Sequence, residues 1–154
     1  MAKLVSFTIT KNNNITERLG MEYILSVDRR FFVPDLISRK KILELHGLGN
    51  NFIRAFDMVM FQNEIEDSDE IEIENINDTI LVELKVTKKE LPNNPDGFFF
   101  GATENEFQLA NLLGDRFRWG FVSIHENSKS FSLLTMNELE SRIKNKRTQY
   151  QINL

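Results

Sequence analysis

The segment Thr79–Thr87 places the strongest constraint on the fold of this 154-residue chain. Its residues are apolar or β-branched except for Glu83 and Lys85, which predicts a mostly buried strand. These two residues are two positions apart, so their side chains project from the same face of the strand. Charged side chains in an apolar strand are costly to bury alone, and the sequence therefore predicts that the fold supplies partners for both.

A single acid also interrupts an apolar segment upstream. Asp57 is the only acid in residues 52–61, which we predict to form a mostly buried strand. One shared site would explain Asp57, Glu83 and Lys85 together. Two alternatives stay open: Glu83 and Lys85 can form a structural ion pair on a half-exposed sheet face, and Asp57 can cap a turn.

The composition limits the chemistry that this chain can perform. It has no Cys and two His, which excludes disulfides, thiolate nucleophiles and Cys-ligated metal sites and argues against a histidine metal cage. The formal net charge is −4, but residues 64–78 hold eight acids and no base. The rest of the chain has 19 basic and 15 acidic residues. We interpret it as a mildly basic body with one acidic ribbon, so the net charge does not exclude a phosphate-bearing partner.

The remaining pattern predicts both helices and strands. We expect strands over residues 4–10, 70–74, 117–124 and 130–136, and helices that begin at Thr16, at the N-cap Ser38, and at two capping boxes, Thr103 with Glu106 and Asn137 with Glu140. This order predicts an α/β (α+β) fold with a mixed central sheet flanked by helices, as a single domain over residues 1–154 with its core at about 38–146. No segment has the apolar length of a signal peptide or a transmembrane helix, which predicts a cytoplasmic protein without a membrane partner.

Two carboxylates and a lysine on neighbouring strands suit metal-assisted phosphodiester hydrolysis. Mg²⁺ prefers hard oxygen ligands, which Asp57 and Glu83 can supply if their oxygens lie about 3–5 Å apart. The ion would lower the pKa of a water molecule and stabilise charge on the phosphate. Lys85 could orient that water or neutralise charge in the transition state.

The same residues resemble the motif of the PD-(D/E)XK nuclease superfamily. Asp57, 25 intervening residues and then Glu83-Leu-Lys85 on an apolar strand follow its pattern, although Phe56 stands where many members have Pro. Residues 98–122 also resemble nuclease-like domains related to the C-terminus of the plant No Vein protein. The resemblance covers roughly residues 40–125. It implies a restriction-endonuclease-like fold and a Mg²⁺-dependent endonuclease, with Mn²⁺ as a substitute ion, that hydrolyses DNA in a restriction or other anti-foreign-DNA role.

The resemblance also implies roles for individual residues. Asp57 and Glu83 would be the metal ligands and Lys85 the catalytic lysine. Gln108 falls where some members place a substrate-orienting Gln, and Glu44, with Glu22 behind it, is the best candidate for an additional acid on the first core helix. Cutting both DNA strands with one small domain requires two active sites, so we expect a homodimer or a partner subunit.

Several basic residues are candidates for contacts with the phosphate backbone. Lys88 and Lys89 continue the strand that carries Glu83 and Lys85, and the other candidates are Arg39, Lys40, Lys41, Arg116 and Arg118, with Arg142, Lys144, Lys146 and Arg147 near the end of the chain. A solvated surface explains such charges equally well. The acidic ribbon is predicted to be a solvent-facing hairpin. The alternative function is therefore a non-catalytic accessory domain that binds nucleic acid or protein on a nuclease-like fold.

Overall fold

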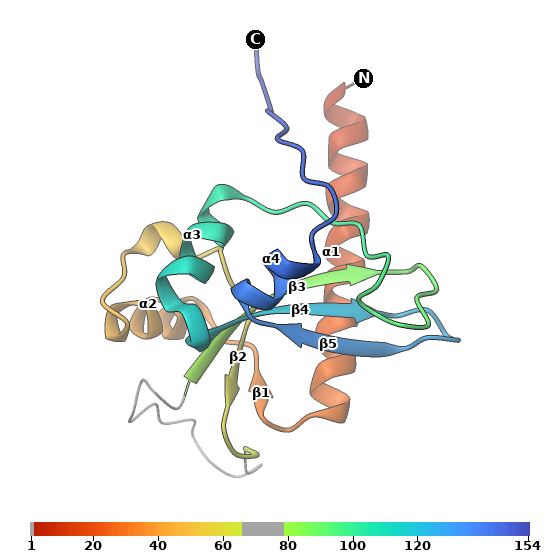
Figure 1. The fold of residues 1–154 in the computed structure, drawn as a ribbon. Helices are drawn as coiled ribbons and strands as arrows, with labels where there is room; N and C mark the ends of the chain where they lie inside the picture. The colour runs from red at the N-terminus through yellow and green to blue at the C-terminus, as the bar shows by residue number, and fades with distance from the viewer. Residues whose placement is uncertain (1, 66–78) are drawn as a thin grey trace.

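A computed structural model describes residues 2–65 and 79–154 and shows a five-stranded mixed sheet flanked by helices (Figure 1). The predicted α+β fold with a mixed sheet is confirmed. The predicted strand over residues 70–74 and most of the acidic ribbon lie outside the described residues. In chain order the elements are α1 (Ala2–Val27), β1 (Phe31–Phe32), α2 (Leu36–Leu45), the 3₁₀ helix η1 (Asn50–Phe52), β2 (Met58–Phe61), β3 (Thr79–Thr87), α3 (Glu104–Leu113), the 3₁₀ helix η3 (Gly114–Arg116), β4 (Phe117–Ser123), β5 (Ser130–Leu134) and α4 (Met136–Arg142).

The central strand of the sheet is β3, over the residues that the sequence predicts. The strand order is β1-β2-β3-β4-β5, and β3 pairs antiparallel with β2 and parallel with β4. A parallel pair needs a long crossover connection, and α3 lies in this one. In the register of β3 and β4, Glu83 pairs with Trp119 and Lys85 with Phe121. Both charged residues are therefore central in the sheet.

The two faces of the sheet pack against different helices. On one face, Leu81 and Trp119 join an apolar cluster with side chains of α2, α3 and α4. On the other face, Val82 and Leu84 pack with Ile24 of α1. Because side chains alternate along a strand, Glu83 and Lys85 point to the same face as Leu81, toward α3. Figure 1 shows α1 passing the sheet, with its N-terminal part extending beyond the strands.

The prediction for the N-terminus is wrong. Residues 4–10 belong to α1 instead of a strand, and Thr16 lies inside this helix instead of capping it. Each β-branched residue lowers helix propensity by less than about 0.7 kcal/mol. A helix that is already nucleated extends more easily than a new one forms. Gly20 shows where α1 meets the sheet, because a Cβ there would lie 2.5 Å from Cγ2 of Val86.

Two other boundaries in the first half of the chain also differ from the prediction. The helix α2 begins before Ser38, and its N-cap is Asp35, whose carboxylate accepts a hydrogen bond of 2.8 Å from the Ser38 N–H. The apolar segment 52–61 forms a strand only over Met58–Phe61. Its first residues complete η1 and a turn, which bury Phe56 without strand pairing.

One predicted capping box is confirmed and the other is displaced. Thr103 and Glu106 cap α3 reciprocally, as the sequence predicts. At α4 the box is formed by Thr135 and Glu138 instead of Asn137 and Glu140, because the helix begins directly after β5. In the described part of the chain, no helix combines the length and the apolar character needed to cross a membrane.

Candidate metal site

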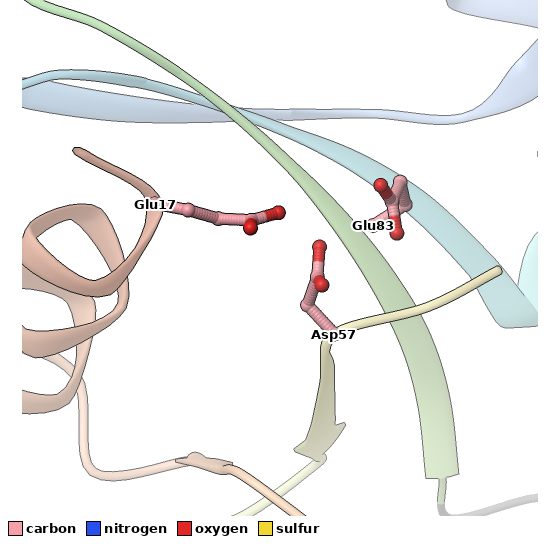
Figure 2. A group of neighbouring side chains, drawn as sticks. All are labelled: Glu17, Asp57 and Glu83. Atoms are coloured by element: carbon pink, nitrogen blue, oxygen red, sulfur yellow. The ribbon is translucent and has the colours of Figure 1, made fainter. Parts of the chain in front are cut away.

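Three carboxylates from separate elements meet at the end of β2 that lies nearest to Glu83. Glu17 of α1, Asp57 just before β2 and Glu83 of β3 each place one oxygen within 4.8 Å of the others. We name these three residues the carboxylate cluster. Figure 2 shows the Glu17 and Asp57 side chains extending toward one another beside the strand that carries Glu83. The separation of Asp57 and Glu83 lies within the range that one shared ion requires.

The point at which β2 begins determines the position of Asp57. The pairing of β2 with β3 ends at Met58 and Val82, and the Asp57 N–H still donates to the Val82 carbonyl at 2.8 Å. The next backbone donor of β3 on the side that faces β2 is the Leu84 N–H, which donates to Asp57 Oδ2 at 2.8 Å. A side-chain carboxylate therefore replaces the backbone of a partner strand. This replacement holds the Asp57 carboxylate beside Glu83.

Arg39 fixes the segment that leads to Asp57. Its guanidinium donates to the carbonyl oxygens of Pro34, Ile53, Phe56 and Asp57. It also lies over the Phe56 ring, 5.2 Å from the ring centroid. The sequence predicts that Arg39 contacts phosphate, but its half-buried guanidinium is directed to the protein backbone instead. Its structural effect is to support the residue that precedes β2.

Glu17 is the one acid of the carboxylate cluster that the sequence does not predict. The sequence predicts Glu44, with Glu22 as the second choice, as the additional helix acid. Glu44 is exposed on α2, and the exposed Glu22 forms an ion pair of 3.8 Å with Arg18. Glu17 precedes Gly20 by three residues, so the two share a face of α1. The predicted helix that begins at Thr16 contains both residues, but the sequence does not show that Gly20 packs closely against Val86 of the sheet.

Lys85 lies beside the carboxylate cluster and contacts two acids. Its Nζ atom is 2.7 Å from Oε1 of Glu106 and 3.3 Å from Oε1 of Glu83. The same atom lies 5.8 Å from the centroid of the Trp119 ring. Glu106 belongs to α3 and is only 5% exposed. The sequence indicated Glu106 as a capping residue and gave no sign of its contact with Lys85.

The other predicted site residues lie on the surface or at the ends of strands. Gln108 is exposed on α3, and Lys88 and Lys89 are exposed directly after β3. Lys40 and Lys41 are exposed on α2. Arg116 and Arg118 flank the start of β4, where Arg118 donates to the backbone oxygens of Asp115 and Phe117. The structure therefore brings Asp57, Glu83 and Lys85 together, but not Glu44 or Gln108.

The carboxylate cluster carries more negative charge than its surroundings favour. Burial, together with repulsion from Asp57, raises the pKa of Glu83 well above its ordinary value of 4.5. Burial also raises the pKa of Asp57, and burial and repulsion from Asp57 raise the pKa of Glu17. Each of these carboxyls is thus harder to ionise in the folded protein than in the unfolded chain.

The ion pair beside the cluster behaves in the opposite way. Burial alone would lower the pKa of Lys85, but Glu83 and Glu106 outweigh it and raise that pKa above 10.5. Burial would raise the pKa of Glu106, but Glu83, Lys85 and the Thr103 N–H together hold it below its ordinary value. Lys85 and Glu106 are therefore the charged pair of this region, and Glu83 is the acid that most needs a further cation.

The donor set of the cluster fits a hard divalent cation. All three groups offer carboxylate oxygens, the ligands that Mg²⁺ and Mn²⁺ prefer. The Oε2 atom of Glu83 is buried and has no hydrogen-bond partner among the described residues. Glu17, Asp57 and Glu83 would hold the ion, which would replace their mutual repulsion by attraction.

We expect the carboxylate cluster to destabilise the metal-free protein increasingly as the pH rises above about 4.5. The folded state has the higher carboxyl pKa values and binds more protons, so the free energy of unfolding falls until the pH passes those values. His46, whose pKa burial lowers to about 4, acts in the opposite sense below 6.5. The difference in stability between the wild type and Glu83→Gln isolates the effect of the cluster, because both proteins contain His46 and its contribution cancels.

Chemical denaturation of both proteins without metal, from about pH 5 to about pH 8, measures this effect. The Glu83→Gln variant should gain stability relative to the wild type as the pH rises. Mn²⁺ at 100 times its dissociation constant should then add about 2.7 kcal/mol to the wild type alone. A difference between the two proteins that does not change with pH would contradict the prediction.

Comparisons with protein-family models, curated proteins and solved structures found no match for this chain. The fold and the site define its class only as an α+β protein with a mixed sheet and a candidate carboxylate metal site. The resemblance to the PD-(D/E)XK superfamily stays a prediction that depends on Asp57, Glu83 and Lys85.

Proposed function

We propose that this protein is a divalent-cation-dependent phosphodiesterase that cuts DNA. The observation that carries the proposal is the meeting of three carboxylates within 4.8 Å, with the Lys85 ammonium 3.3 Å from one of them. A structural ion pair accounts for Lys85 with Glu83 or Glu106. It does not account for Glu17, or for Asp57, whose charge repels both Glu17 and Glu83. Buried groups with perturbed pKa values that lower stability are typical of functional sites.

Each residue of the proposed site has a distinct task. Glu17, Asp57 and Glu83 would bind Mg²⁺ or Mn²⁺, and Asp57 is held in position by the Leu84 N–H. When bound, the ion lowers the pKa of a water molecule and offsets negative charge on the phosphate. Lys85 would place a fixed positive charge beside the scissile phosphate or orient the attacking water. Glu83 and Lys85 lie on the central strand, which keeps their spacing rigid.

A polymeric substrate is favoured by the basic residues that follow the site. Lys88 and Lys89 are exposed directly after Lys85 along β3 and its following turn. Exposed lysines beside a phosphodiesterase centre can bind the phosphates that flank the scissile bond. One site of this size would nick a single strand. A double-strand cut would therefore require a homodimer or a partner subunit.

Incubation with supercoiled plasmid tests the proposed function. We expect Mg²⁺ or Mn²⁺ to support conversion to nicked circles, and EDTA to prevent it. Glu140 is an exposed acid of α4, and the variant Glu140→Gln should cut the plasmid as the wild type does. Cleavage that persists in EDTA, or no cleavage with either metal, would contradict the proposal. Retarded migration of DNA without cleavage would favour the accessory-domain alternative.

A further inference from the structure

We propose that Glu106 is a positioning residue that keeps the Lys85 ammonium at the site while Glu83 is engaged by a cation. Its consequence for catalysis rests on the proposed function. The contact on which it depends can be measured without any activity.

The geometry gives Lys85 two anionic partners on different elements. Glu83 lies on the same strand, and Glu106 lies on α3. The ammonium is closer to Glu106, at 2.7 Å, than to Glu83, at 3.3 Å. A cation on Glu83 would compete for that carboxylate and would also repel the ammonium. A second anion, outside the carboxylate cluster, is therefore needed to hold Lys85 in place.

Glu106 is fixed in a way that suits this task. Its Oε1 atom accepts from Lys85, and its Oε2 atom accepts from the Thr103 N–H at 2.8 Å and from the Thr103 hydroxyl at 3.1 Å. The Glu106 N–H donates back to Oγ1 of Thr103 at 3.2 Å. Both carboxylate oxygens are thus occupied, and the N-terminus of α3 favours their negative charge. Local capping geometry therefore fixes the position of the lysine partner.

A second capping box in the same chain shows what capping alone requires. At α4, Oε1 of Glu138 accepts from the Thr135 N–H at 3.1 Å, and the Glu138 N–H donates to Oγ1 of Thr135 at 3.2 Å. Glu138 is exposed, whereas Glu106 is 5% exposed. Burial of Glu106 against Lys85 is therefore additional to the capping role. Glu138→Gln is a matched control for Glu106→Gln.

Nuclear magnetic resonance of ¹⁵N-labelled lysine side chains tests the contact directly. An ammonium held by two acids exchanges its protons slowly enough to be observed, and Lys85→Met identifies which signal belongs to Lys85. In the wild type and in Glu138→Gln, we expect this signal to persist when Mg²⁺ is added. In Glu106→Gln, whose amide keeps the shape of the side chain, the signal should disappear with Mg²⁺. A signal that persists in Glu106→Gln would overturn the inference.

Cleavage kinetics test the consequence. Glu106→Gln should lower kcat for plasmid nicking about 10–100-fold, the usual effect of losing a group that orients a catalytic residue. The KM for DNA and the affinity for Mg²⁺ should not change. Glu138→Gln, which makes the same change in the other capping box, should retain full kcat. An equal loss in both variants would show that capping alone matters and would overturn the inference. If the wild type does not cut DNA, the proposed function fails, and the ammonium signal still decides whether Glu106 positions Lys85.

Discussion

Asp57→Asn and Glu83→Gln should each abolish metal-dependent DNA cleavage and at the same time stabilise the metal-free protein. Each substitution removes a ligand and one negative charge from the carboxylate cluster. Loss of activity should exceed about 100-fold, because losing even an outer partner of a metal ligand costs about 10–100-fold. The free energy of unfolding should rise at neutral pH, because both buried carboxyls are harder to ionise in the folded protein than in the unfolded chain.

The substitutions preserve the local structure, which makes the opposite signs informative. Asn at position 57 can still accept the hydrogen bond from the Leu84 N–H through its side-chain oxygen. Calorimetric titration with Mg²⁺ or Mn²⁺ measures the lost affinity, and denaturation in EDTA measures the gain in stability. The controls Asp115→Asn and Glu140→Gln make the same chemical changes at exposed positions and should alter neither quantity. Unchanged metal affinity in Asp57→Asn would contradict the assignment of this residue as a ligand.

Lys85→Met should give the second large effect, with a different pattern. Cleavage should fall by about 100-fold or more, because a fixed charge is removed from the transition state. Metal affinity should be retained or increased, because the cluster loses its nearest cation. The metal-free protein should lose about 3 kcal/mol, because Glu83 and Glu106 remain buried without the lysine. Added Mg²⁺ should restore part of that stability.

The pattern across the assays distinguishes a catalytic lysine from a structural one. Plasmid nicking, metal titration and denaturation are performed on Lys85→Met and on Lys129→Met. Lys129 is exposed and lies over the Tyr23 ring, 5.3 Å from its centroid, so its loss should leave all three measurements close to those of the wild type. Wild-type cleavage by Lys85→Met would contradict the catalytic role. Loss of metal affinity in this variant would show that Lys85 instead supports the structure of the metal site.

The sequence predicts the central strand and two of the three clustered acids because these features are local. Thr79–Thr87 alternates an apolar face with a face that holds Glu83 and Lys85, and no packing information is needed to find it. Asp57 stands out because it is the only acid in an apolar segment. The Asp57 carboxylate accepts a hydrogen bond from the Leu84 N–H of β3, a role similar to the turn cap that the sequence offers as an alternative. The same carboxylate also belongs to the carboxylate cluster.

Glu17 and Glu106 could not be predicted because their roles depend on how helices pack. Glu17 reaches the cluster because α1 is one continuous helix that approaches Val86 at Gly20. The helix predicted to begin at Thr16 contains both Glu17 and Gly20, but no local pattern shows that this helix face packs on the sheet. Glu106 already had a sufficient local explanation in the capping box with Thr103. Its contact with Lys85, 21 residues away, requires the crossover that brings α3 over the sheet.

The pairing between β2 and β3 ends at Met58 and Val82. Beyond this point, a regular strand ladder and the candidate metal site cannot exist together. Asp57 can offer its carboxylate only because no further residue of β2 takes the Leu84 N–H into the ladder. A variant in which β2 continued along β3 would have a more regular edge, but its backbone would occupy the position of the carboxylate. The irregularity is thus a requirement of the site. A redesign that aims at greater stability should leave this edge unpaired.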